Sequence, residues 1–172
     1  LSELCEEASI PESHGVGHAL KVLAHAEAAL AASATPLPPA RQLAIKLAAL
    51  LHDADDKKYF PAKSVPAYPN ARRILSRVLG PTADSGASDG VAAEALKMIG
   101  WVSCSVNGNS CPPEAVDEPD LLWPRWADRL EAVGHRGVYR CWQVNTENGD
   151  ALSVASTPRP ASEEEVFALA TP

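Results

Sequence analysis

The sequence lacks any apolar stretch close to the roughly 20 residues that a membrane-spanning helix requires. It also lacks a basic start followed by an apolar run, which is the pattern of a secretory signal peptide. These two absences predict a cytoplasmic protein without a membrane partner.

Aromatic residues are scarce at 5% of the chain, whereas hydrophobic residues together make up 46%. This composition is that of a globular protein, and its many alanines favour closely packed helices. Positive charge is scarce too, because 15 Lys and Arg stand against 22 Asp and Glu. A polymer of nucleic acid needs clustered cations, so none is expected as a partner, while a small phosphorylated substrate needs only local positive charge.

The four cysteines include no CxxC pair, so a zinc ribbon is not predicted. Free, mostly buried thiols in a reducing cytosol are the expected state. A disulfide between Cys104 and Cys111 is the alternative that the sequence leaves open.

Apolar residues recur at helical spacing along most of the chain, and no alternating pattern lasts long enough to predict a sheet. Asn70 is the expected N-cap of one helix and Gly80 its end. The expected helices cover about 15–32, 40–53, 70–79, 91–102, 121–133 and a further segment through Val138, Tyr139 and Trp142. Residues 54–68, 81–90 and 107–117 are expected loops, and a short helix is possible at 163–169.

A chain of 172 residues is long enough for one well-buried core and short for two. We therefore predict one all-α domain over residues 1–172, with its core at about 13–145 and an irregular tail at 146–172. The helix at 40–53 is apolar nearly all round and is expected to lie at the centre.

The pair His52-Asp53 stands at the end of this most apolar helix. Adjacent side chains on a helix point about 100° apart, so both can reach one ion only where the helix ends. A buried imidazole and carboxylate are costly unless satisfied, and a metal ion satisfies both. The alternative is a helix C-cap with a solvated carboxylate, which the helix dipole disfavours.

Further candidate ligands lie in two other helical segments. His14, His18 and His25 are spaced to share one face of the first helix, although a lone histidine in such a place is more often a hydrogen-bonded core residue. Asp128 lies in an apolar context beside Arg129, where an ion pair is the ordinary interpretation.

Three segments together resemble the HD-domain phosphohydrolase family. SHGVGHALKV, at residues 13–22, resembles the opening motif, AALLHD, at 48–53, matches the central "ALLHD", and ADRLEAVG, at 127–134, looks like the "ADRLEAIG" element. They occur in the family's order and cover about residues 13–140. The resemblance implies an HD-domain-like helical bundle.

The resemblance also implies a metal site formed by His18, His52, Asp53 and Asp128. Two imidazoles and two carboxylates suit Mn²⁺, which we expect, with Mg²⁺, Co²⁺ or Ni²⁺ as alternatives. One metal ion is expected, because the additional His pair that two-metal members require is absent between His52 and Asp128.

The implied activity is hydrolysis of a phosphate ester or anhydride through a metal-activated water. Members that hydrolyse guanosine tetraphosphate carry Glu-Asp where this chain has Asp56-Lys57. The closer resemblance is to a nucleotide-pyrophosphohydrolase branch with an HDxxDxK pattern, which Asp56 and Lys58 match, and these two are the expected catalytic residues. A nucleoside 5′-monophosphatase and a non-catalytic nucleotide-binding module are the alternatives.

Substrate phosphates are expected to contact His14, Lys21, Lys58 and Arg129. For the three cations among them, a solvated or ion-paired side chain is the ordinary alternative. Glu131 is expected to pair with a cation, and His25 to pack. The "HYYDKLL"-like stretch usual in this branch has no counterpart before Pro172, so the C-terminus is expected either to diverge or to be incomplete.

Overall fold

The computed structural model describes residues 1–60, 68–80, 90–150 and 162, and every regular element within these ranges is helical, as predicted. The elements, in chain order, are α1 (Ser2–Glu7), η1 (Glu12–His14), α2 (Val16–Ala32), α3 (Pro39–Leu51), α4 (Pro69–Leu79), α5 (Val91–Val102), α6 (Cys104–Asn107), α7 (Glu114–Asp117), η3 (Pro119–Leu122), α8 (Trp123–Leu130) and α9 (Gly134–Asn148). None of the helices in the described residues is both long and apolar enough to cross a membrane.

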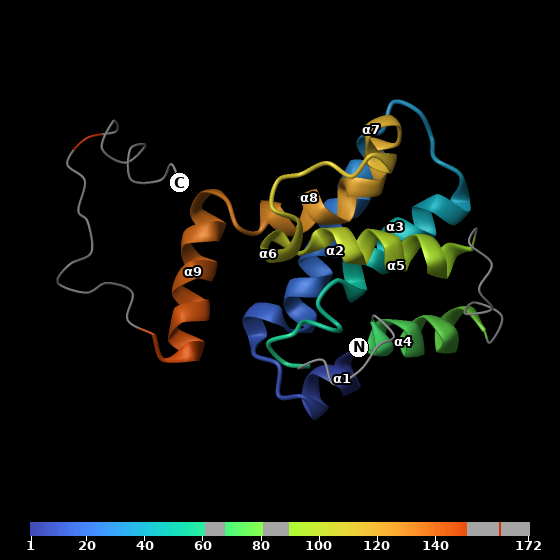
Figure 1. The fold of residues 1–172 in the computed structure, drawn as a ribbon. Coiled ribbons are helices and arrows are strands. Elements are labelled where there is room, and N and C mark those ends of the chain that lie inside the picture. The colour runs from blue at the N-terminus through green and yellow to red at the C-terminus, as the bar shows by residue number, and fades with distance from the viewer. Residues whose placement is uncertain (61–67, 81–89, 151–161, 163–172) are drawn as a thin grey trace.

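Helix α3 is the centre of the bundle, which confirms the expectation from its apolar sequence. It packs against α2, α5 and α8, as Figure 1 shows. Ala48 of α3, Ala26 of α2, Ala95 of α5 and Ala127 of α8 are all buried in one hydrophobic cluster. Because alanine side chains are small, the four helix axes can approach closely and still exclude water.

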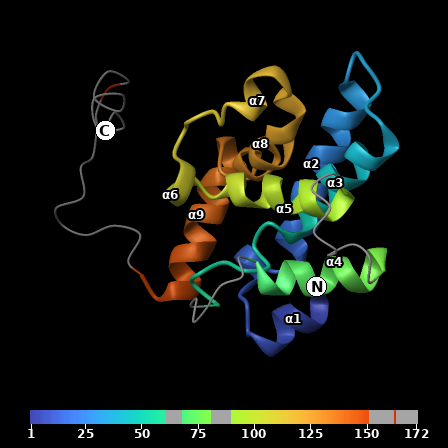
Figure 2. The same cartoon turned by 45° about the vertical axis from the view of Figure 1, so that its right-hand side comes forward.

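A second layer closes the lower side of this core. In Figure 2, α4 lies beneath α5, and α1 lies below α4. Leu75 of α4 and Leu4 of α1 are buried in the same hydrophobic cluster as the central helices. The two N-terminal elements α1 and η1 were not predicted from the sequence.

Helix α4 begins differently from the prediction. Its N-cap is Tyr68 and its first residue Pro69, so the assignment of Asn70 as N-cap is wrong. The Asp55 carboxylate instead accepts the backbone N–H groups of Asn70 and Ala71, each at 2.9 Å. Gly80 does end the helix, as predicted, with a φ of 93° that favours glycine.

Other boundaries shift by a few residues. Helix α3 ends at Leu51, before the pair His52-Asp53, and α8 begins at Trp123 with Pro124 in its first turn, as expected. The region 107–117, predicted as a loop, contains the short helix α7. Residues 61–67, 81–89 and the possible helix at 163–169 lie outside the described part of the chain.

The four cysteines form no disulfide. Cys5 is partly buried, but Cys104, Cys111 and Cys141 are exposed, so the expectation of mostly buried thiols is wrong. The free state of the thiols agrees with the prediction.

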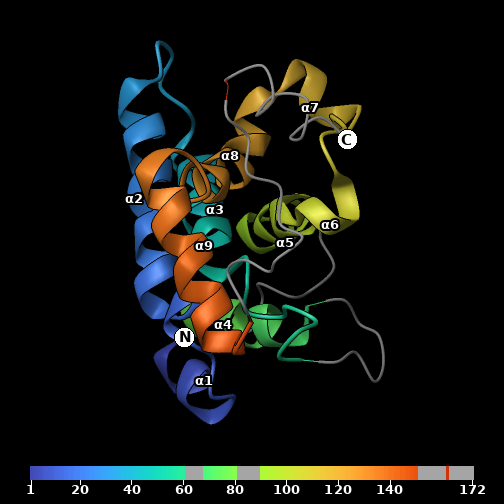
Figure 3. The same cartoon turned by 90° about the vertical axis from the view of Figure 1, so that its left-hand side faces the viewer.

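Helix α9 stands apart from this packing. None of its residues is buried, and it contacts the η1 turn, as Figures 1 and 3 show from two sides. Its exposed apolar side chains include Val138, Tyr139 and Trp142. We call this helix the α9 arm.

Candidate metal centre

The end of α3 brings two adjacent side chains to one point. His52 is the C-cap of the helix, and the chain turns immediately afterwards, with the Ala54 N–H donating to Leu51 O at 3.0 Å. The His52 Nε2 atom lies 3.2 Å from Asp53 Oδ2 as a result. His52 Nδ1 lies 2.9 Å from Ala49 O, and because a carbonyl only accepts, Nδ1 carries the hydrogen and Nε2 is directed at the cluster.

Two other core helices complete the arrangement. His18, buried on α2, places Nε2 3.3 Å from His52 Nε2. Asp128, on α8, places Oδ1 3.2 Å from His18 Nε2. We call His18, His52, Asp53 and Asp128 the metal cluster.

The spacing of these atoms fits one ion. Divalent ions hold nitrogen and oxygen ligands at about 2.0–2.2 Å, which sets neighbouring ligands about 3.0–3.5 Å apart. The other two ligand pairs, His18 Nε2 to Asp53 Oδ2 and His52 Nε2 to Asp128 Oδ1, lie at 3.8 and 3.7 Å. The group His18, His52 and Asp53 can therefore hold a metal ion, and Asp128 borders both of its histidines.

The carboxylates of the metal cluster favour a positive charge between them. Burial opposes ionisation of Asp53, but His52 and His18 outweigh it and hold the pKa of this carboxyl well below its ordinary value. Burial likewise opposes protonation of His52, yet Asp53 and Asp128 raise its pKa to about 9. A divalent cation can replace this proton, because metal ligands bind in the deprotonated form.

A cavity of about 450 Å³ opens on one side of the cluster, between the 52–58 segment and the end of α5. We call it the α5-side cavity. His52, Asp53 and Asp128 line it, and so do the predicted catalytic residues Asp56 and Lys58. The Lys58 N–H donates to Asp56 Oδ1 at 2.9 Å, which fixes the carboxylate.

His14 lines the same cavity, but from outside the helix on which it was predicted. It belongs to the η1 turn, before α2 begins at Val16, so the three histidines do not share one helix. Its Nδ1 lies 2.9 Å from Ser13 Oγ and 3.1 Å from Tyr59 Oη. Burial lowers the pKa of His14, which favours the neutral ring.

A second cavity, of about 350 Å³, lies on the other side of the cluster, between α2 and the α9 arm. We call it the α9-side cavity. His18 and Lys21 both line it, in agreement with the prediction that they share a face. The predicted phosphate-binding residues Lys21 and Lys58 therefore lie in different cavities.

Arg129 is not brought to the cluster and lines neither cavity. Its guanidinium donates to Asn109 Oδ1 at 2.7 Å and to Gly108 O, and lies 5.0 Å from the Trp126 ring. The geometry gives no support to its predicted substrate contact.

Glu131 pairs with a cation, as expected: its Oε1 lies 3.0 Å from Arg136 Nη1. The same oxygen lies 2.8 Å from His25 Nε2. His25 is therefore a hydrogen-bonding partner rather than a residue that only packs.

Arg140, on the α9 arm, borders the metal cluster and was not predicted from the sequence. Its Nη2 lies 3.0 Å from His18 Nε2 and 3.2 Å from Ser13 O, and its Nη1 lies 3.5 Å from Asp128 Oδ1. Since a guanidinium only donates, His18 Nε2 must accept this hydrogen bond, which requires that Nε2 carry no hydrogen. No local pattern marks this arginine, because it lies on a helix without a buried face.

Comparison with known proteins finds similarity to a relative that is itself uncharacterized. The chain is 33% identical over 162 residues to an uncharacterized protein of Acanthamoeba polyphaga mimivirus. The match covers 91% of this chain and 63% of the viral protein, so the chain spans less than two thirds of that relative's length. No family model and no solved structure matches the chain.

Proposed function

We propose that this chain is a metal-dependent phosphohydrolase of the HD type, acting on a phosphate ester or anhydride of a nucleotide. The observation that carries the proposal is the meeting of two imidazole Nε2 atoms with two carboxylates from three helices, at 3.2–3.8 Å. The three segments that resemble the HD family are far apart in the sequence, yet their His and Asp residues form this one cluster.

The donor set supports a single divalent ion, and we propose Mn²⁺. Mixed imidazole and carboxylate ligands suit Mn²⁺, Co²⁺ or Ni²⁺, with Mg²⁺ at the carboxylate-rich extreme. Such an ion would polarise a phosphoryl oxygen and make a water molecule more acidic. The remaining chemistry falls to side chains of the α5-side cavity and to Arg140.

Asp56 is proposed to take the proton from the attacking water. Its Oδ1 already accepts the Lys58 backbone N–H, which leaves the second oxygen for this task. The Lys58 ammonium, in the same cavity, is proposed to offset negative charge on the substrate.

His14 and Arg140 are proposed to hold the phosphoryl group. The hydroxyls of Ser13 and Tyr59 can donate to His14 Nδ1, which places the ring hydrogen on Nε2 as a donor for a phosphate oxygen. Arg140 offers a planar, permanently charged group beside Asp128 and His18.

The test measures metal content and phosphate release together, on protein purified without chelator. A panel of nucleoside mono- and triphosphates is supplied with added Mn²⁺, and orthophosphate and pyrophosphate are detected separately. We expect one bound ion and turnover in the wild type, and loss of both in His52→Ala. His25→Ala, which removes an imidazole outside the cluster, is the matched control and should retain the ion.

Each outcome has a distinct meaning. Pyrophosphate released from a triphosphate supports the pyrophosphohydrolase, whereas orthophosphate released from monophosphates supports the 5′-monophosphatase instead. If metal is bound but no member of the panel is hydrolysed, the proposed hydrolysis of nucleotides is contradicted, and a nucleotide-binding module without catalysis is favoured. Absence of metal from the wild type, or unchanged activity in His52→Ala, overturns the site.

A further inference from the structure

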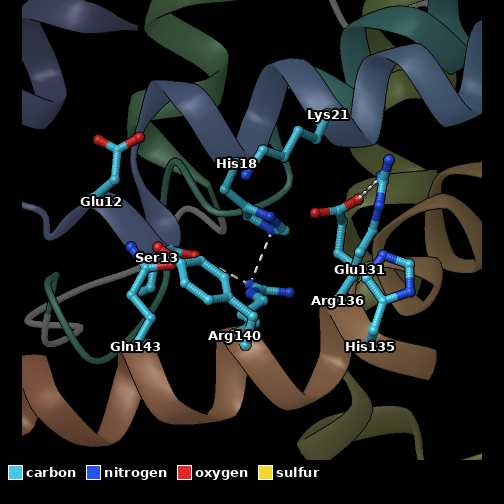
Figure 4. A pocket seen from close by; sticks show the side chains of 10 residues that line it. Glu12, Ser13, His18, Lys21, Glu131, His135, Arg136, Arg140 and Gln143 are labelled. Atoms are coloured by element: carbon cyan, nitrogen blue, oxygen red, sulfur yellow. Dashed lines mark hydrogen bonds and ion pairs between the residues drawn. The ribbon is translucent and has the colours of Figure 1, made fainter.

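The α9-side cavity forms a second chamber beside the metal cluster. Figure 4 shows its two walls, with His18 and Lys21 side by side on α2, and His135 and Arg136 on the facing end of the α9 arm. Ser13, from the η1 turn, closes one side. Of these residues, the mechanism proposed above uses only His18 and Ser13.

The cavity carries an excess of positive charge. Two acidic residues line it, but Glu131 is already bonded to His25 at 2.8 Å and to Arg136 at 3.0 Å. Glu12 stands apart from the cationic side chains in Figure 4. Of the carboxylates that the structure describes, none forms a salt bridge with Lys21, so its ammonium is available to an anion.

Arg140 joins this chamber to the rest of the site. It lines both cavities, and its guanidinium lies between Asp128 Oδ1 and the Ser13 carbonyl, as Figure 4 shows in part. Its side chain is 19% exposed, so it is shielded more than a surface arginine. A phosphate at the cluster would therefore touch Arg140 and could extend into either cavity.

The α5-side cavity has the opposite character. Ile99, Val102 and Val106 give it an apolar wall, and the Tyr68 ring lies in the same lining. Four acidic residues also line it, Asp53, Asp55, Asp56 and Asp128, against the three cationic side chains of Lys57, Lys58 and Arg140. The excess of carboxylates disfavours a chain of phosphates here, although Lys58 and Arg140 can still meet a single phosphate at the cluster. An uncharged sugar and base can pack on the apolar wall.

The geometry points to a division of the substrate between the two cavities. We propose that the nucleoside of a nucleoside triphosphate lies in the α5-side cavity and that its two terminal phosphates lie in the α9-side cavity, held by Lys21, Arg136 and Arg140. This inference rests on the proposed function, because the α-phosphorus must then lie at the metal cluster. It adds a binding subsite and an orientation that fix the substrate class.

The orientation determines which bond breaks. The oxygen of water bonds to the α-phosphorus, and the bond from the α-phosphorus to the bridging oxygen breaks. That oxygen leaves with the electron pair as part of pyrophosphate, and the proton lost by the water passes through a carboxylate to solvent. The products are a nucleoside monophosphate, pyrophosphate and a proton.

The subsite is tested by calorimetric titration of inorganic pyrophosphate into the metal-free and the Mn²⁺-loaded full chain. We expect Lys21→Gln to weaken binding about tenfold in both forms, and Lys21→Arg to restore it, because the charge is the essential feature. Lys97→Gln, which removes an exposed lysine from α5 outside both cavities, is the matched control and should bind as the wild type does. Thermal melts verify that each variant is folded.

A second measurement follows products from the wild type with a nucleoside triphosphate. Pyrophosphate as the first product supports the orientation, and orthophosphate cut from the γ-position overturns it. Equal pyrophosphate affinity in wild type and Lys21→Gln overturns the subsite even if turnover is normal, which leaves the proposed function standing. Weaker binding in Lys21→Gln without turnover on any nucleotide supports the anion subsite while the proposed function fails.

Discussion

The helical core and the α9 arm contribute different parts of the candidate site. The core supplies the metal cluster from α2, α8 and the end of α3, where the His18 and His52 side chains are only 4% and 2% exposed. The α9 arm has no buried residue, yet it supplies Arg140 and one wall of a cavity. Metal ligands need fixed positions, whereas side chains that meet a substrate must remain accessible, so the two tasks fall to differently packed regions.

The largest expected effect comes from removing a ligand supplied by the core. Asp128→Asn keeps the shape of the side chain but removes its charge. We expect metal affinity to fall at least about 100-fold, because even a partner that only hydrogen-bonds to a metal ligand is worth about 10–100-fold. Turnover should fall with it. Metal titration by calorimetry and phosphate release measure the two effects.

Asp117→Asn is the matched control for this loss of charge, because Asp117 is an exposed carboxylate of α7 outside both cavities. It should bind metal as the wild type does. If Asp128→Asn retains full affinity, Asp128 is a neighbour of the ion and not a ligand.

The next largest effect distinguishes the role of the α9 arm from that of the helical core, because it changes the rate of turnover and leaves metal binding intact. In Arg140→Gln we expect the rate to fall about 100-fold, as when one preorganised donor to a reacting group is removed. Metal content should stay unchanged, because no ligand is lost. Loss of metal together with activity would show that the arm is part of the metal site, and the comparison would then fail.

How far the sequence could predict this site depends on the range of the interactions. His52-Asp53 was recognisable because two ionisable side chains end an apolar helix, and the bundle around α3 followed from helical periodicity. The N-terminal cap of α4 could not be recognised from the sequence. The Asp55 carboxylate that accepts the Asn70 N–H lies 15 residues earlier in the chain. Helix and capping propensities depend on residues that are neighbours along the chain, so they do not predict a cap that comes from a distant turn.

The two arginines show the same limit within the site. Arg129 follows Asp128 directly, but adjacent side chains on a helix diverge by about 100°, so Arg129 points to the 108–109 turn and not to the cluster. Arg140 lies on a helix that buries nothing, and from sequence it resembles any solvated arginine. Only the direction of the α9 arm brings it to His18.

A smaller effect on stability and substrate binding is expected at the start of α9, where the chain turns after α8 and the direction of the α9 arm is set. A Cβ on Gly137 would lie 2.4 Å from Ala132 O and 2.5 Å from Ala132 C, which are backbone atoms that cannot move aside. Gly137→Ala should therefore shift the α9 arm, cost roughly 1–3 kcal/mol of unfolding free energy and weaken substrate binding. Metal affinity should be retained.

Gly90→Ala is the control for Gly137→Ala, because a Cβ there meets no atom within 4 Å and φ is −95°. Denaturant titration and Michaelis constants are measured for both variants. Equal stability and equal Michaelis constants would mean that the start of α9 does not position Arg140.

The smallest expected effect comes from the substitution of valine by threonine, made once on the α9 arm and once in the helical core. Val138, on the α9 arm, is 74% exposed, and Val22, on α2, is fully buried. Val138→Thr should change the free energy of unfolding by less than about 0.5 kcal/mol, as surface substitutions usually do. Val22→Thr should cost roughly 1–3 kcal/mol, because it places a hydroxyl among apolar side chains.

The pair measures how independent the α9 arm is from the core, since the chemical change is identical and only the packing differs. Urea titrations of both variants give the two free energies with their m-values. A cost at Val138 equal to that at Val22 would mean that in solution another surface covers the outer face of the arm. Arg140 would then be fixed by that surface as well as by its contacts with Ser13 and His18.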